Sequence, residues 1–251
     1  MDSLILVIIF SLLGSIVSLS GGFLLLASRH RDKLAEYATA FAAGALLAAA
    51  FVDLLPEAFS IGENQLVSYG IFGGILFFFI LEGVLHWFHR HRHHGSDKGT
   101  DPVVPLVVIG DTIHNFIDGI AIAAGFLVSP TVGIIVTLVV AAHEIPQEIG
   151  DFGLLLKRGV KRGKVLLYNI FSAIATTVGA VSFFIIGEQN DIEIAPVLGI
   201  VAGFFIYVAV SDIIPSIHQK KSRGHIIRDS IILIAGAAVV SAVIYLLHDI
   251  I

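Results

Sequence analysis

The sequence contains no cysteine and few charged residues. None of its 251 residues is cysteine and only 14% are charged, whereas 56% are hydrophobic. The absence of cysteine excludes disulfide scaffolds, thiolate metal sites and cysteine nucleophiles. Soluble domains carry about 25% charged and about 45–50% apolar residues. The composition therefore excludes an ordinary soluble enzyme, a nucleic-acid-binding module and a disordered chain, and it predicts a membrane protein.

Eight apolar stretches predict eight transmembrane helices, because about 20 apolar residues cross the hydrocarbon core of a bilayer. The first stretch begins at Leu4 with no basic region before it, so it predicts a true span and not a signal peptide. The expected fold is a single all-α transmembrane domain over residues 1–251, surrounded by the lipid bilayer. The predicted spans are 4–27, 34–58, 67–88, 103–127, 131–157, 164–186, 194–216 and 226–248.

All 15 Lys and Arg residues lie in or beside four of the predicted loops. These loops follow the first, third, fifth and seventh spans, so they share one side of the membrane. The positive-inside rule assigns that side to the cytoplasm. The sequence therefore predicts a multi-pass protein of the cell membrane with both termini outside.

The acidic residues are distributed differently from the basic ones. A charged residue at the bilayer centre costs at least roughly 2.5–3.5 kcal/mol. Asp118 and Glu144 fall at mid-span and therefore need water, protons or cations, whereas acids at span ends can face the headgroups. Nine acids lie within or at the ends of spans: Asp53, Glu57, Glu82, Asp111, Asp118, Glu144, Glu148, Asp151 and Asp212.

The fourth and fifth spans each carry a histidine, carboxylates and an amide at helical spacing. Histidine nitrogen together with carboxylate oxygen suits zinc and other borderline divalent metals. The sequence therefore predicts a metal site between these two spans. One face of the fourth span presents Asp111, His114, Asn115 and Asp118, and the fifth presents His143, Gln147 and Asp151 with Glu144 and Glu148 beside them.

The same residues allow a second interpretation. His143-Glu144-x-x-Gln147 differs by one residue from H-E-x-x-H, the metalloprotease helix in which two His bind zinc and the Glu is the general base. An intramembrane zinc-dependent hydrolase built on His143 and Glu144 is therefore the alternative. It leaves the other acids within the spans without a role.

The motifs H-N-F-x-D-G and H-E-I-P-x-E-I-G-D-F resemble the signatures of the ZIP (Zrt-, Irt-like) family of divalent-metal transporters. The resemblance covers the whole chain and implies a transporter, not an enzyme. It implies an inverted-repeat bundle of three, two and three helices, over about 4–88, 103–157 and 164–248, that works by alternating access. The implied ligands are His114, Asp118, His143 and Gln147 for a first metal, and Asn115 and Glu144 for a second position.

Two features of the chain depart from this pattern. Gln147 stands where the closest branch of the family has histidine, and the sixth span carries no acid where some members have a carboxylate. The resemblance therefore implies a second metal position that is weak or auxiliary.

Two short sequence motifs indicate where the ion enters and leaves. Asp53-Leu-Leu-Pro56-Glu57 and Asp212-Ile-Ile-Pro215 share the pattern D-apolar-apolar-P at opposite ends of the second and seventh spans, as an inverted repeat would place them. The resemblance places Asp53 and Glu57 near the outer entrance and Asp212 near the inner exit. Asp111 and Glu148 are predicted to be auxiliary.

A histidine-rich loop is expected over about 89–101, on the cytoplasmic side. Short His-rich tracts bind metals weakly, so this loop is predicted to capture the exiting ion. Its candidate ligands are His89, His91, His93 and His94.

The expected substrate is Zn²⁺ moving into the cytoplasm. Fe²⁺, Mn²⁺, Co²⁺ and Cd²⁺ accept the same ligands, so the residue types do not select among them. Gly70-x-x-x-Gly74 and Gly199-x-x-x-Gly203 match a helix-packing motif. They permit a homodimer without assigning one, and no nucleic acid partner is expected.

Overall fold

The computed structural model describes residues 3–27, 30–91, 103–190, 192–215 and 223–250. Within these ranges every regular element is a helix, and eight helices are long and apolar enough to cross a membrane. The predicted number of spans and the all-α class are confirmed. The elements are α1 (Ser3–Ala27), α2 (Arg31–Ala48), η1 (Ala49–Leu54), α3 (Leu55–Ile61), α4 (Asn64–His91), α5 (Val103–Val128), α6 (Pro130–Lys157), α7 (Arg162–Gln189), α8 (Ile194–Tyr207), η3 (Val208–Ile213) and α10 (Arg223–Ile250).

The second and seventh spans are each interrupted by a π-helical segment. The segments η1 and η3 end two residues before Pro56 and Pro215, respectively. Proline lacks an N–H, and its ring clashes with the carbonyl four residues earlier, so a widened turn relieves the conflict. The shared D-apolar-apolar-P motif therefore produces the same local structure, a π-helical segment, in both spans. Pro146 instead lies inside the continuous helix α6.

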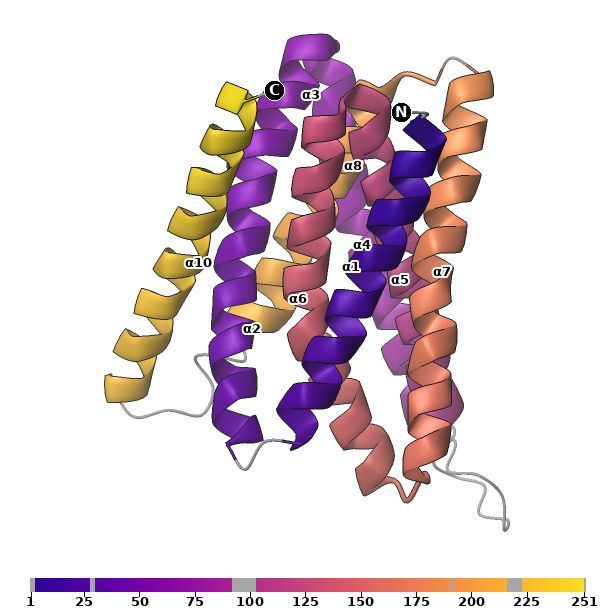
Figure 1. The fold of residues 1–251 in the computed structure, drawn as a ribbon, viewed down its shortest axis with the longest axis vertical. Helices are drawn as coiled ribbons and strands as arrows, with labels where there is room; N and C mark the ends of the chain where they lie inside the picture. Colours follow the sequence, from indigo (N-terminus) through magenta and orange to yellow (C-terminus); the bar gives the residue numbers. More distant parts are fainter. Residues whose placement is uncertain (1–2, 28–29, 92–102, 191, 216–222, 251) are drawn as a thin grey trace.

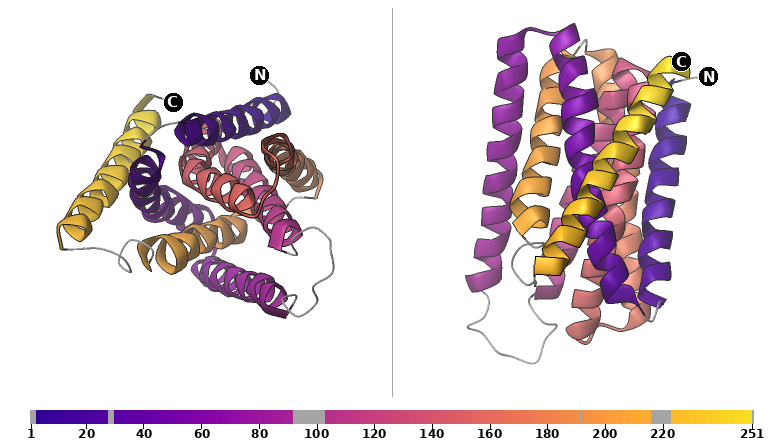
Figure 2. Two further views of the ribbon diagram at one scale, coloured as in Figure 1. Left: turned by 90° about the horizontal axis from the view of Figure 1, so that it is seen from below. Right: turned by 90° about the vertical axis from the view of Figure 1, so that its left-hand side faces the viewer.

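The helices form one bundle with both ends of the chain at the same end of it (Figure 1). Helix α6 lies in the interior, between α1, α2 and α5, whereas α10 lies at the edge and packs mainly against α2 (Figure 2). Large apolar side chains are exposed on α1, α4 and α10. Such outward apolar faces are what a membrane-spanning bundle turns toward lipid.

The two G-x-x-x-G motifs meet inside the chain, in the contact between α4 and α8. A Cβ atom on Gly70 would lie 2.3 Å from the carbonyl oxygen of Pro196, and one on Gly203 would lie 2.4 Å from that of Ile71. Only glycine lets the two backbones approach so closely. The motifs are thus accounted for by packing within one chain.

Candidate metal centre

Helices α5 and α6 form an antiparallel pair joined by a single residue, Ser129. The Ser129 side chain accepts a hydrogen bond from the backbone N–H of Val132 at 3.2 Å and caps the start of α6. Counted along the chain, His114 precedes this turn by fifteen residues and His143 follows it by fourteen. The tight turn therefore brings the two histidines to the same depth in the bundle.

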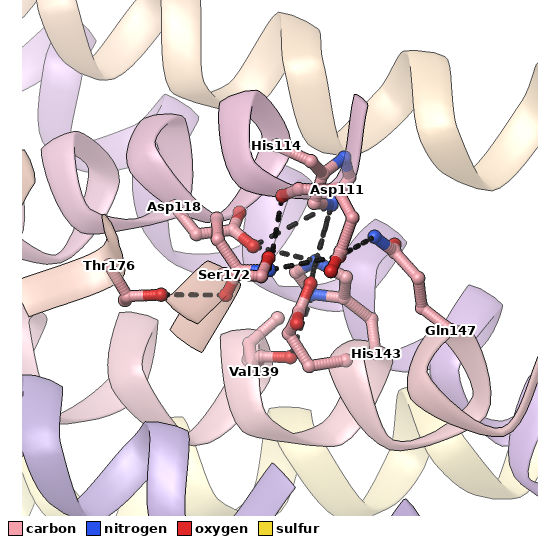
Figure 3. Close-up of polar contacts among 10 residues, drawn as sticks. Asp111, His114, Asp118, Val139, His143, Gln147, Ser172 and Thr176 are labelled. Carbon is pink, nitrogen blue, oxygen red and sulfur yellow. Dashed lines mark hydrogen bonds and ion pairs between the residues drawn. The ribbon is translucent and has the colours of Figure 1, made fainter. Parts of the chain in front are cut away.

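Four side chains converge between these helices; His114, Asp118 and His143 are labelled in Figure 3. His114 and Asp118 come from α5, and His143 and Glu144 come from α6. One ligand atom from each lies within 4.8 Å of the other three. We refer to these four residues as the histidine cluster.

The distances within the histidine cluster approach those of a coordination shell. The Nε2 atom of His143 lies 3.3 Å from Asp118 Oδ2 and 3.4 Å from His114 Nε2. His114 Nε2 is 3.6 Å from both Asp118 Oδ2 and Glu144 Oε1. Tetrahedral zinc with bonds of about 2.0–2.1 Å places its ligand atoms about 3.3–3.4 Å apart. His143 Nε2 is 3.9 Å from Glu144 Oε1, and the four ligand atoms all lie within 4.8 Å of one another, so the side chains would have to move closer together to form such a shell.

The acids of the cluster are buried and lack hydrogen-bond partners. Asp118 is 0% exposed and Glu144 is 3% exposed. In the part of the chain that the structure describes, neither oxygen of Asp118 nor Glu144 Oε1 has a hydrogen-bond partner. Buried carboxylate oxygens without partners are costly, so these atoms require a cation or a proton.

Aromatic side chains of α8 border the cluster on one side. The ring of Phe204 meets that of His114 edge-on with centroids 5.1 Å apart, and Phe205 packs against His143 at 5.9 Å. The His114 side chain is 18% exposed, more than that of any other cluster member. It faces a cavity of about 100 Å³ whose lining includes Glu82 and Tyr207.

The orientation of His143 is fixed by a backbone group. Its Nδ1 atom lies 3.1 Å from the carbonyl oxygen of Val139. When Nδ1 carries the proton and donates it to this carbonyl, Nε2 has a free lone pair directed at the cluster. A hydrogen bond on the distal nitrogen is the usual way in which a metal-binding histidine is held.

Asn115 lies outside the histidine cluster and bridges α5 to α7. Its amide nitrogen donates to Asp111 Oδ1 at 3.1 Å and to Ser172 Oγ at 3.0 Å. Its oxygen accepts a hydrogen bond of 2.7 Å from the Thr176 hydroxyl. The sequence reasoning gave Ser172 and Thr176 no role, although two hydroxyls at a spacing of four residues in an apolar helix are a usable signal.

Gln147 also points away from the four converging atoms. Its amide nitrogen donates to Asp111 Oδ1 at 3.5 Å, and the two residues lie equally far, eighteen positions, from Ser129. Figure 3 shows Gln147 directed at Asp111 and not at the histidines. The structure therefore brings together four of the six predicted ligands, and the other two bind Asp111.

Of the predicted auxiliary residues, Asp111 lies beside the cluster and bonds to Asn115 and Gln147, and Glu148 is buried one turn further along α6. The predicted entry and exit residues lie elsewhere. Asp53 is buried near the far end of the bundle, with its Oδ1 atom 3.5 Å from His248 Nε2, and Glu57 follows it in α3, half-buried. Asp212, His89 and His91 lie in helices, but the structure does not describe their side chains; His93 and His94 lie outside the described residues.

Comparison with known proteins gives a consistent result. The family model described as ZIP Zinc transporter matches residues 2–105 and 90–244. Zinc transporter ZIP13 of Pongo abelii is 31% identical over 258 residues, which cover 92% of this chain and 76% of that protein. Human zinc transporter ZIP10 is 36% identical over 139 residues, covering 51% of this chain but 17% of its own length. Zinc transporter ZIP10 of Danio rerio is matched over 18% of its length, so this chain spans less than a fifth of the ZIP10 proteins.

Proposed function

Because this chain belongs to the ZIP zinc transporter family, we propose that it carries a divalent metal ion, Zn²⁺, across the membrane through the histidine cluster. One observation carries this proposal. Two imidazoles and two carboxylates converge in the buried space between α5 and α6. The orphan oxygens of Asp118 and Glu144 supply the reason for a cation to bind there.

The charge of the cluster matches one divalent ion. Ionised Asp118 and Glu144 contribute two negative charges, and neutral His114 and His143 contribute nitrogen ligands without charge. An ion that sheds its hydration shell here exchanges water for four protein ligands, which suits the coordination preference of Zn²⁺. The set also accepts Fe²⁺, Mn²⁺, Co²⁺ and Cd²⁺.

The cluster is proposed to hold a single ion. The second position predicted from the sequence would draw on Asn115, but both ends of its amide are engaged by Asp111, Ser172 and Thr176. Using Asn115 as a ligand would require these hydrogen bonds to rearrange.

Movement of the ion is proposed to follow alternating access, with the ion passing through the cavity beside His114 on one side of the bundle. The ion is proposed to move into the cytoplasm, with both termini of the protein on the extracytoplasmic side of the membrane. Two facts support that orientation: the termini share one end of the bundle (Figure 1), and the Lys and Arg residues lie in or beside the loops of the opposite side.

The hydrolase interpretation finds no support. The relatives compared above are named zinc transporters. Gln147, which would have to replace the second histidine of the protease motif, bonds to Asp111 instead.

Metal flux into proteoliposomes tests the proposal. Asp118→Asn and His143→Ala each remove one ligand from the cluster, so we expect Zn²⁺ uptake to fall by an order of magnitude or more. The control is Glu188→Gln, which neutralises an exposed carboxylate at the end of α7 and should leave uptake unchanged. Unchanged uptake by both cluster variants would refute the site. Peptide cleavage that is lost in Glu144→Gln, without any metal flux, would favour the hydrolase.

A further inference from the structure

A second, smaller cavity adjoins Glu144 of the histidine cluster. Its lining comes from α1, α5, α6 and α7, whereas the cavity beside His114 is lined by α4, α5, α8 and η3. Its volume is about 10 Å³. A cavity of about 10–15 Å³ is the smallest that holds a water molecule, so this one has room for a single water and for nothing larger. We call it the serine cavity, and its polar lining residues are Ser15, Ser18, Asn115, Glu144 and Thr176.

Two hydroxyl groups of the serine cavity already donate their protons elsewhere. Ser15 Oγ lies 3.0 Å from the carbonyl oxygen of Ser11 and 3.2 Å from that of Ala173, and its proton serves this pair of acceptors. The Thr176 hydroxyl donates to Asn115 Oδ1 at 2.7 Å. A hydroxyl oxygen keeps lone pairs after its proton is donated. Ser15 and Thr176 can therefore each accept a hydrogen bond from a water in the cavity.

Ser18 and Glu144 supply the other partners that a water needs. Each of these two residues is 3% exposed. The hydroxyl of Ser18 can donate to a water, whereas an ionised Glu144 can only accept from one. A water that accepts from Ser18 and donates to Glu144 and to one of the two hydroxyl oxygens makes three hydrogen bonds, the usual number for a buried water.

We propose that the serine cavity binds one ordered water molecule, which hydrogen-bonds to the Glu144 carboxylate and connects it to α1. This inference rests on the proposed function and deepens it, because Glu144 belongs to the histidine cluster as well as to the cavity lining. Helix α1 contributes none of the four residues of that cluster. Through Ser18 and the water, α1 nevertheless supports the binding of the ion.

The water holds Glu144 ready for the ion. Glu144 Oε1 lies 3.6 Å from His114 Nε2 and 3.9 Å from His143 Nε2, so this oxygen faces the imidazoles. A hydrogen bond from an outer partner fixes the orientation of a metal ligand and raises metal affinity. A carboxylate that is already oriented loses less conformational freedom when the ion binds. The water also gives the buried carboxylate a hydrogen-bond donor when no ion is bound.

The Zn²⁺ affinity of the purified full-length protein tests the proposal. Binding by the histidine-rich segment is removed in the parent protein by alanine at His89, His91, His93 and His94. Ser18→Ala removes the group that donates to the water, and we expect the dissociation constant for Zn²⁺ to rise about three- to tenfold, as the loss of one hydrogen bond predicts. The double variant Ser15→Ala/Ser18→Ala takes both serine hydroxyls out of the cavity and should bind Zn²⁺ more weakly still.

Ser11→Ala is the matched control. Ser11 precedes Ser15 by one turn on the same face of α1, and its hydroxyl lies 3.3 Å from that of Thr177 on α7, but it is not part of the cavity lining. We expect its dissociation constant to equal that of the parent. An equal loss of affinity in Ser11→Ala and Ser18→Ala would show that these serines act through helix packing alone and would overturn the proposal, as would unchanged affinity in a folded double variant.

A structure of the Zn²⁺-bound protein that resolves ordered waters gives the direct measurement. It should show one water within about 3.2 Å of both the Glu144 carboxylate and Ser18 Oγ, and a cavity without that water would refute the proposal. Neither failure affects the proposed transport function, because that function fails only if Asp118→Asn and His143→Ala leave uptake unchanged.

Discussion

The contact between α5 and α7 offers a direct test of how helix packing supports the proposed metal centre. Gly119, which follows Asp118, lies against the backbone of α7. A Cβ atom at this position would lie 2.0 Å from the carbonyl oxygen of Thr176 and 2.7 Å from the backbone nitrogen of Ala180. Gly119→Ala therefore drives one helix into another at the level of the histidine cluster.

The size of the effect follows from these distances. Ordinary contacts of a Cβ atom begin near 3.4 Å, so the methyl group overlaps the Thr176 oxygen by 1.4 Å. Because the obstacle is backbone, the two helices must separate by about 1 Å, and such overpacking costs roughly 1–3 kcal/mol. The separation also stretches the 2.7 Å bond from Thr176 to Asn115, whose loss adds about 1 kcal/mol. We expect a total loss of about 2–4 kcal/mol in unfolding free energy.

Thermal unfolding in detergent and Zn²⁺ uptake in proteoliposomes measure the outcome. The matched control is Gly150→Ala on α6, since a Cβ atom there would meet nothing within 4 Å. On helix propensity alone, both substitutions should stabilise the protein by up to about 1 kcal/mol. We expect Gly150→Ala to melt at the same or a slightly higher temperature than the parent with unchanged uptake, and Gly119→Ala to melt at a lower temperature with reduced uptake. If the two variants have equal stability and uptake, α5 and α7 are not in contact at this position.

Three further predictions follow from other contacts. Thr176→Val keeps the side-chain shape but removes the donor to Asn115 Oδ1, so unfolding free energy should fall by about 1 kcal/mol and Zn²⁺ uptake severalfold; unchanged uptake would show that Asn115 does not position the site. Arg228→Gln removes the ion pair to Glu36, which links α10 to α2, together with the contact to the fully buried Asp229 within α10; the melting temperature should drop while the metal count per chain stays the same, and an unchanged melting temperature would argue against the link to α2. Replacing His89, His91, His93 and His94 by alanine should alter uptake much less than Asp118→Asn does, and a well-expressed variant with no uptake would reverse that ranking.

The spans and the two ligand-bearing helices were predictable from the sequence because their signals are local. The bilayer fixes the length of an apolar helix, and the eight stretches read from hydropathy match the helices that can cross a membrane. Helical spacing alone places His114 with Asp118, and it places Glu144 with Glu148, on shared faces. The two D-apolar-apolar-P motifs likewise lie in the two spans that contain π-helical segments.

The composition of the candidate site was decided by the tertiary structure. Spacing fixes which residues share a face of one helix, but the rotation and separation of neighbouring helices decide which atoms meet. Those variables put His143 beside Asp118 and turned Gln147 toward Asp111. The close approach of α7 at Gly119 supplied Thr176 as a partner for Asn115. The sequence by itself therefore determined which helices carry the candidate metal ligands, and the contacts between helices, which no local pattern encodes, determined which of those candidates converge.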